Sequence, residues 1–350
     1  MTQAASATDK TGFKPKAIVR RLMVALPERS RAVLESRFGL GKSPERVTLE
    51  SIGQRYGITR ERVRQIENHA LTSLRKSPAF AEAQAAFKEL ERIVDSLGGI
   101  VCEDDLLNFI TKDQGMQNHI YFLLVLGDPF KYRKEDDEVR RCWYVDPELA
   151  QKVEVALKNL YQGLSDEDLI PEGEMLDRFL KELQNINDKH RNQEVLRRWL
   201  SISKHIGKNP LGEWGHASSP NVKTKGVRDY AYLAVKKHGN PLHFREVATL
   251  IEKTFNRAAH VATTHNELIK DDRFVLVGRG MYALKEWGYA AGVVREVIRN
   301  ILRDNGPLTR DQIVEKVLKE RHVKSGTVVV NLQNQKYFKR GKDERYTLVK

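Results

Sequence analysis

Three side chains that suit the edges of nucleic-acid bases stand together early in the chain: Arg60, Glu61 and Gln65. A guanidinium pairs with guanine, an amide with adenine, and a carboxylate accepts a hydrogen bond from cytosine. Arg64 and Asn68 follow at spacings of three and four residues, so a helix would carry all five on one face. Because such contacts are made from the start of a helix lying in the major groove, the pattern predicts a base-reading helix.

Two short helices and a turn are expected to position this face, over residues 48–76. The face of the second helix opposite the polar residues is apolar at helical spacing, which indicates packing. Gly57 suits the turn, because glycine takes a positive φ without steric cost. Thr59 suits the N-cap of the second helix. The apolar residues in question are Leu49, Ile52 and Tyr56 in the first helix and Val63, Ile66, Ala70 and Leu74 in the second.

Charge is distributed unevenly along the 350 residues, whose formal net charge is +13. Residues 1–77 hold 16 basic and 7 acidic residues, residues 78–205 hold 17 and 25, and residues 206–350 hold 27 and 15. The basic ends have the electrostatic character of phosphate binders, whereas the acidic middle would be repelled by nucleic acid and suits a protein partner. Ordinary solvated surface is the alternative for the middle.

The segment from about Leu26 to Lys76 resembles region 4 of the primary bacterial sigma factors. Three blocks carry the resemblance, in the same order and spacing: VLESRFG at 33–39, TLESIG at 48–53 and TRERVRQIE at 59–67. The resemblance implies recognition of the upstream (−35) promoter hexamer and docking on the β flap of RNA polymerase. It implies base contacts from Arg60, Glu61 and Gln65, and phosphate contacts from Arg29, Arg37, Thr48, Arg62 and Arg64.

Two departures from the family put the target sequence in question. Asn68 and His69 stand where the family usually has Ala-Lys, and the loop 40–46 is more basic than the usual acidic turn. A helix-turn-helix kept only as a protein docking surface, with its Arg and Glu paired along a solvated face, is the alternative.

A pattern of helix, glycine-containing turn, two helices and strand hairpin recurs at 87–145, 227–284 and 293–349, as in winged helices. The 223–288 copy also resembles the HARE-HTH domain found in the δ subunit of bacterial RNA polymerase, through PLHF at 241–244, DRF at 272–274 and the wing Gly278–Gly280. The expected fold is therefore mainly α, with the helix-turn-helix followed by tandem winged helices. The expected parts are a disordered tail (1–14), the region 4-like module (15–77), a winged helix (78–146), a helical part with a degenerate copy and a linker (147–222), the HARE-HTH domain (223–288) and a last winged helix (289–350).

Catalytic and cofactor motifs are missing from the sequence. It holds no phosphate-binding G-x-x-x-x-G-K-[ST] loop, and His260 and His265 lack neighbouring ligands. Cys102 and Cys142 are too few for a disulfide framework, which favours a reducing compartment. No apolar run reaches the about 18 residues that span a bilayer. We expect no enzyme activity, no cofactor, no metal, no membrane contact and no small-molecule substrate.

These features favour a sequence-specific DNA-binding transcription factor in the bacterial cytoplasm, at the nucleoid. Its expected partners are promoter-like duplex DNA and the β flap of RNA polymerase. Basic wing tips, with Arg279 in one and Lys339, Arg340 and Lys342 in the other, are expected to add backbone contacts. Since nothing resembles the part that opens the −10 element, transcription should not start by the usual sigma route. The alternatives are a polymerase adaptor resembling the δ subunit, and an accessory DNA-binding subunit of a modification or restriction system.

Overall fold

The computed structural model describes residues 11–183, 186–289, 294–321, 323–341 and 343–349. The chain divides into two compact units, Met1–Gly207 and Lys208–Lys350, which are described separately. The described residues are mainly helical, with small antiparallel sheets, as the sequence predicts. Of the predicted tail, residues 1–10 lie outside the described residues. None of the described helices is both long and apolar enough to cross a membrane.

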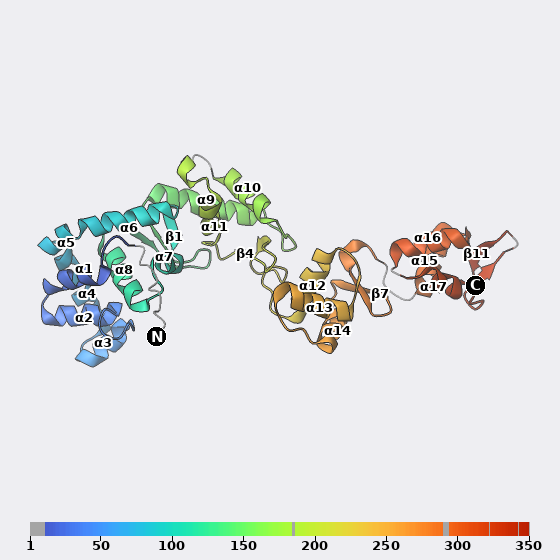
Figure 1. The fold of residues 1–350 in the computed structure, drawn as a ribbon, viewed down its shortest axis with the longest axis horizontal. Coiled ribbons are helices and arrows are strands. Elements are labelled where there is room, and N and C mark those ends of the chain that lie inside the picture. Colours follow the sequence, from blue (N-terminus) through green and yellow to red (C-terminus); the bar gives the residue numbers. More distant parts are fainter. Residues whose placement is uncertain (1–10, 184–185, 290–293, 322, 342, 350) are drawn as a thin grey trace, which may run out of the picture. The chain divides into compact units, whose positions relative to one another are not determined.

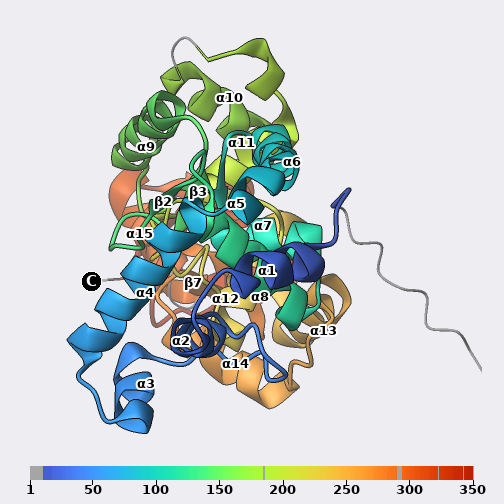
Figure 2. The same cartoon turned by 90° about the vertical axis from the view of Figure 1, so that its left-hand side faces the viewer.

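The first unit begins with a group of helices that share one core (Figures 1 and 2). Helix α8 is its apolar centre: it packs against α1, α2, α4 and α6, and Figure 2 shows it beside α1. The core takes buried residues from Val19 to Trp143, so the region 4-like part and the segment after it are built around the same apolar side chains. The helices that share this core are α1 (Pro15–Val24), α2 (Glu28–Phe38), α4 (Arg60–Arg75), α5 (Pro78–Glu82), α6 (Gln84–Ser96), α7 (Glu103–Ile110) and α8 (Gln114–Leu126). Helix α3 (Leu49–Tyr56) lies outside this core and packs in a smaller apolar cluster.

A small sheet closes this part of the first unit. Its strands are β1 (Ile100–Cys102), β2 (Lys131–Arg133) and β3 (Cys142–Tyr144), in the order β1-β3-β2. Three helices follow, α9 (Pro147–Gln162), α10 (Glu172–Glu182) and α11 (Gln193–Leu200), with a 3₁₀ turn at Asp188–His190. Helix α11 contacts β1, and the indole of Trp199 donates to the carbonyl of Gly98 at 3.2 Å.

A hairpin of β4 (Ile206–Lys208) and β5 (Trp214–His216) stands at the boundary in the chain where the second unit begins. The first helical group of the second unit holds α12 (Val227–His238), β6 (Leu242–His243), α13 (Phe244–Phe255), α14 (Val261–Lys270), β7 (Phe274–Gly278) and β8 (Met281–Leu284), with a 3₁₀ turn at Lys285–Trp287. The last group holds α15 (Val294–Asn305), β9 (Leu308–Thr309), α16 (Arg310–Glu320), α17 (Ser325–Leu332), β10 (Phe338–Arg340) and β11 (Arg345–Leu348).

The recurring order of elements that the sequence predicts is present in all three segments, with one addition. A strand of two or three residues stands where only a turn is expected, as β1, β6 and β9. Each pairs with the second strand of its hairpin, so the sheet orders are alike: β1-β3-β2, β6-β8-β7 and β9-β11-β10. Strands this short leave no period-two pattern in the sequence, because a period needs several residues to repeat.

Candidate nucleic-acid interface

Helices α3 and α4 form a helix-turn-helix whose turn depends on glycine. Gly57 has a φ of 63° and ends α3, as the sequence predicts. Gly53 is needed for a different reason: a Cβ there would lie 2.6 Å from the carbonyl oxygen of Ile58. The hydroxyls of Thr48 and Thr59 accept from the backbone N–H groups of Ser51 and Arg62, each at 3.2 Å, and so cap α3 and α4.

A small apolar cluster under α3 and α4 fixes which face of α4 is open. Val33 from α2, Ile52 from α3 and Val63 from α4 are fully buried together. Farther along α4, Ala70 and Leu74 enter the main core of the first unit. The apolar face predicted for this helix is therefore buried, and the polar face opposite it is open to solvent.

The three predicted base-reading side chains all lie on that open face. Arg60, Glu61 and Gln65 are exposed, in the first turns of α4. Arg60 has no side-chain hydrogen bond or ion pair within the described part of the chain. Glu61 accepts two hydrogen bonds from Arg64, at 2.6 and 2.8 Å, and Gln65 accepts one from Arg62 at 3.1 Å. The hydrogen bonds from Arg64 lower the pKa of Glu61, so this carboxyl is ionised near neutral pH.

The predicted phosphate-contacting residues divide into two groups. Arg29, at the start of α2, and Thr48, Arg62 and Arg64 are exposed. Arg37 faces inward: it donates to the carbonyl of Val47 at 3.4 Å, and its Nε lies 3.6 Å from a carboxylate oxygen of Glu67. Burial raises the pKa of Glu67, and the charge of Arg37 offsets that rise only in part. Arg37 thus ties α2 to α4, and its phosphate contact stays a prediction.

One feature of this interface was missed by sequence reasoning: a clamp formed by Asn118 of α8 on the loop between α2 and α3. The amide nitrogen of Asn118 donates to the carbonyls of Gly39 and Pro44, at 3.1 and 2.7 Å. Its oxygen accepts from Arg46 at 2.8 Å, and the Arg46 guanidinium lies 3.9 Å from the centre of the Tyr121 ring. Burial lowers the pKa of Arg46. The arginine that makes this loop look basic is therefore turned toward the protein.

The run 116–126 carried a partial signal for this clamp. Gln117, Asn118 and His119 are polar residues at the start of a run that is otherwise apolar apart from the Tyr121 hydroxyl. A polar side chain that is buried in this way needs hydrogen-bond partners. The sequence could have predicted that Asn118 is paired, but not that its partners lie in a loop more than 70 residues away.

The predicted wing cations lie in or beside strand turns. Arg279 occupies the turn between β7 and β8 and is exposed, as the sequence predicts for this hairpin. Lys339 and Arg340 are exposed in β10, and Arg340 donates to Glu344 at 2.7 Å. Lys342 lies outside the described residues. The contacts of these side chains with DNA stay predictions.

Metal-ligand chemistry has no visible place in the described part of the chain, where no group of three His, Cys, Asp or Glu side chains could hold an ion. His260 precedes α14 and is exposed, and the ring of His265 stacks on Phe244 with centroids 4.2 Å apart. Cys102 and Cys142 are buried free thiols that face one another across β1 and β3.

The capped turn, the buried cluster beneath it and the open polar face together form a unit for presenting α4. Residues 22–76 match the family model for Sigma-70, region 4. This region 4 module covers the end of α1, the whole of α2 and the helix-turn-helix. The match confirms the first resemblance seen in the sequence, and the HARE-HTH resemblance of 223–288 stays a prediction.

Sigma factors are similar to this chain over stretches of 55–65 residues. The chain is 46% identical over 65 residues to the RNA polymerase sigma factor RpoD of Helicobacter pylori, covering 19% of the chain and 10% of that protein. It is 49% identical over 57 residues to the sigma factor RpoS of Coxiella burnetii, and 44% over 55 residues to the principal sigma factor HrdD of Streptomyces viridifaciens, each covering 16% of both proteins. The chain thus spans about a tenth to a sixth of the length of these relatives.

Proposed function

We propose that this chain is a sequence-specific DNA-binding transcription factor that reads promoter DNA resembling a −35 element through the region 4 module. The open face of α4 supports this proposal most directly. It presents Arg60, Glu61 and Gln65 from the first turns of a helix whose other face is buried. These are the side chains that suit guanine, cytosine and adenine, and the start of a helix is where such contacts are made in the major groove.

Association with RNA polymerase is the second part of the proposal. The relatives that match this chain over 55–65 residues are named as RNA polymerase sigma factors. We propose that the module brings the chain to polymerase, with the β flap as the docking site. The chain would then act in transcription initiation or in its regulation.

The remaining segments are proposed to be winged helices that add contacts of their own. The shared order of helices, strands and sheet connections supports this assignment for 78–146, 223–288 and 289–350. Arg279, Lys339, Arg340 and Lys342 would contact the DNA backbone, where cations increase affinity through the release of counterions without reading sequence.

A randomised-site selection with the full-length protein tests the DNA-reading part. We expect a defined motif for the wild type, and relaxed preference at one position each for Arg60→Ala and Gln65→Ala. A motif of unchanged content and strength in both variants would refute the assignment of α4. Capture of RNA polymerase on the tagged full-length protein, with and without added promoter DNA, tests the second part.

A polymerase adaptor is the second candidate, and the charge of the middle segment favours it. Residues 78–205 hold 17 basic and 25 acidic residues, which suits a basic protein surface better than DNA. In that case polymerase capture would persist in Arg60→Ala, and selection would return no motif. A motif that depends on Arg60 would favour the first candidate.

A further inference from the structure

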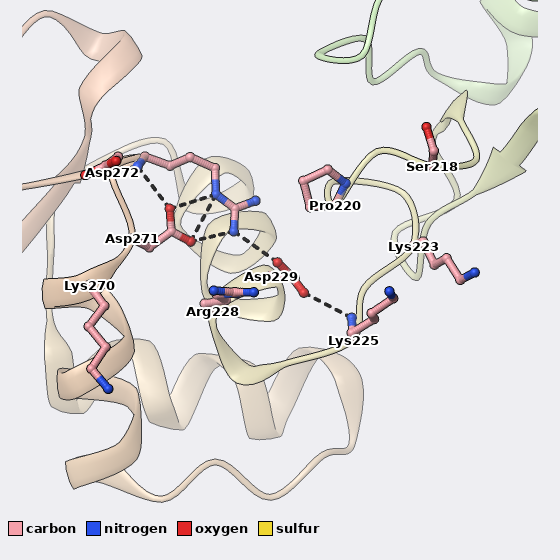
Figure 3. Close-up of a pocket in the computed structure, with 10 residues that line it drawn as sticks. Ser218, Pro220, Lys223, Lys225, Arg228, Asp229, Lys270, Asp271 and Asp272 are labelled. Atoms are coloured by element: carbon pink, nitrogen blue, oxygen red, sulfur yellow. Dashed lines mark hydrogen bonds and ion pairs between the residues drawn. The ribbon is translucent and has the colours of Figure 1, made fainter.

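The second unit contains a polar pocket that the proposed function does not use (Figure 3). It lies where the segment before α12, the first turn of α12 and the end of α14 meet. Its volume is about 450 Å³, which is within the size range of small-ligand sites. It is lined by Ser218, Pro220, Lys223, Lys225, Arg228, Asp229, Lys270, Asp271, Asp272 and Arg273.

Arg273 holds the frame of this pocket together. It donates to Asp271 at 2.6 Å, to Asp229 at 3.0 Å and to the side chain of Asn221 at 2.9 Å. Burial favours the neutral form of Asp271, but the hydrogen bonds and charge of Arg273 outweigh it and lower the pKa of this carboxyl. Asp229 also accepts hydrogen bonds from the backbone N–H groups of Gly226 and Lys225, which precede it in the chain, at 3.1 and 3.0 Å. Three segments are thus fixed before any ligand arrives.

Four further cations line this fixed frame and are free of ion pairs within the described part of the chain. Lys223, Lys225, Arg228 and Lys270 are all exposed, and none has a side-chain hydrogen bond there. In Figure 3, Arg228 lies between Lys270 on one side and the lysines of the segment before α12 on the other. Lys270 comes from the end of α14, about 40 residues along the chain from the other three, so its nearness to them is a product of the fold.

The charge balance of the lining favours an anion. Five cations face three carboxylates, a net charge of +2. Two of the carboxylates, Asp229 and Asp271, are already bound to Arg273, whereas Asp272 is exposed and has no such partner within the described residues. Like charges held close together repel one another, and an anion among them relieves that repulsion. The pocket also adjoins the start of α12, where the helix dipole favours negative charge.

We propose that this pocket binds a phosphate group. Lysine serves phosphate as a compact point charge and arginine as a donor of paired hydrogen bonds, and the pocket offers both. Its lining is charged, which suits a phosphorylated ligand and not an apolar one. The group could belong to a small polyphosphate or nucleotide or to the backbone of DNA, and the chemistry of recognition is the same for both. Asp272 opposes the ligand and limits its affinity.

Calorimetry with inorganic pyrophosphate and the full-length protein tests the proposal. We expect binding at one site per chain, weakened about tenfold or more in Arg228→Ala and in Lys270→Ala, because a charge-assisted hydrogen bond contributes about 1.5–3 kcal/mol. Asp272→Asn should strengthen binding, because it removes the opposing charge. Lys253→Ala, an exposed cation of α13 outside the lining, is the matched control and should change nothing. Thermal unfolding of each variant checks that the fold is intact.

A second arm distinguishes the two sources of phosphate. A random duplex of about two helical turns is titrated into the same variants at low salt. If pyrophosphate binds and Arg228→Ala leaves duplex affinity unchanged, the ligand is a small phosphorylated molecule. If pyrophosphate fails to bind and Arg228→Ala and Lys270→Ala both weaken the duplex while Lys253→Ala does not, the ligand is the DNA backbone. Equal behaviour of all three variants in both arms would overturn the proposal. Arg60→Ala should leave pyrophosphate binding intact, so failure of the proposed function is detected separately.

Discussion

Arg64 donates hydrogen bonds to both carboxylate oxygens of Glu61, at 2.6 and 2.8 Å, one turn apart on the open face of α4. The pair occupies the acceptor atoms that a cytosine amino group would use. Each oxygen keeps a further lone pair, so Glu61 can accept from a base only in the orientation that Arg64 leaves open, or after this contact loosens. Arg60 has no such partner within the described residues, so it can bind a base edge without first breaking an interaction.

We therefore expect Arg60 to contribute more to base discrimination than Glu61. Arg60→Ala should cost about 1–3 kcal/mol of preference for the best base at one position, the value of a good bidentate contact. Glu61→Ala should cost less at its own position, because the contact of Glu61 with Arg64 restricts how it can meet a base and so reduces the gain from reading that base. Competition binding with single-base variants of the selected site measures both. Arg92→Ala is the control, since Arg92 is an exposed arginine of α6 whose side chain is 78% accessible. A larger loss of discrimination in Glu61→Ala would contradict this ranking.

We expect Arg37 to contribute more to the stability of the fold than to DNA binding. Arg37→Ala leaves Glu67 half-buried without its cation, and an unpaired polar group of this kind costs about 1–3 kcal/mol. Denaturant unfolding should show the loss, and adding Glu67→Gln should recover part of it. If Arg37→Ala only lowered the salt dependence of DNA binding, the phosphate role would be the correct one.

The stability of Arg37→Ala should also depend on pH. The pKa of Glu67 in the folded protein is raised above its ordinary value, chiefly by burial. A carboxyl with a raised folded pKa destabilises the fold when it is ionised, so this penalty appears as pH rises through the ordinary pKa toward the folded one. Without Arg37 it costs more to keep Glu67 ionised in the fold. The loss of unfolding free energy in the variant should therefore be full at neutral pH and shrink as the pH falls through the pKa of Glu67 in the folded protein. A loss of unfolding free energy that is equal at neutral and at acidic pH would exclude Glu67 as its cause.

Asn118 is expected to set the rigidity of the loop between α2 and α3. Asn118→Ala leaves the carbonyls of Gly39 and Pro44 unpaired and frees Arg46, at a cost of about 1–3 kcal/mol. Hydrogen exchange should speed up in residues 39–47 more than in α4. Asn159→Ala, on the exposed face of α9, is the matched control. Unchanged exchange in the loop would show that the clamp does not order it.

The region 4 module could be predicted from the sequence because its determinants are local. The two caps, the turn at Gly57 and the buried face of α4 all depend on spacings of a few residues. The clamp of Asn118 and the inward turn of Arg37 could not be predicted in this way. Both depend on which helix packs where, and α8 reaches α2 from about 80 residues farther along the chain.

The shortest strands likewise could not be predicted from the local sequence. Hairpins such as β7–β8 follow from two short apolar runs around a Gly-Arg-Gly turn. Strands β6 and β9 have two residues each and exist because the second strand of each hairpin offers them a free edge. An edge made by the chain about 40 residues later leaves no mark on the local sequence.

Gly53 is expected to be irreplaceable where another helical glycine is not. Gly53→Ala would place its Cβ 2.6 Å from the carbonyl oxygen of Ile58, and overpacking of this kind typically costs about 1–3 kcal/mol. Because α3 must then move against α4, DNA affinity should fall as well. Gly173→Ala in α10 has open space around it and should stabilise the protein by about 0.4–1 kcal/mol. Thermal unfolding separates the two, and equal shifts of the same sign would contradict the steric argument.

Substitutions of the wing cations should separate a DNA-binding role of the wings from a protein-binding one. Lys339 is exposed and lacks an ion pair within the described residues, whereas Arg340 is paired with Glu344. If these wings lie along a DNA backbone, Lys339→Ala and Arg279→Ala should each weaken binding to all sequences alike. Each should reduce the slope of log K against log salt by about 0.9, the value for one phosphate contact.

In the same wing, Glu344→Ala should change DNA affinity in the opposite direction. It releases Arg340, and because an exposed ion pair is worth only about 0–1 kcal/mol, the gain in DNA affinity should be at most severalfold. Lys319→Ala, in α16 and away from the wing, is the control and should leave the slope unchanged. Filter binding of the full-length protein across a salt series measures all four variants. Slopes that stay equal in every variant would mean that these wings serve a protein partner, and that the region 4 module alone contacts DNA.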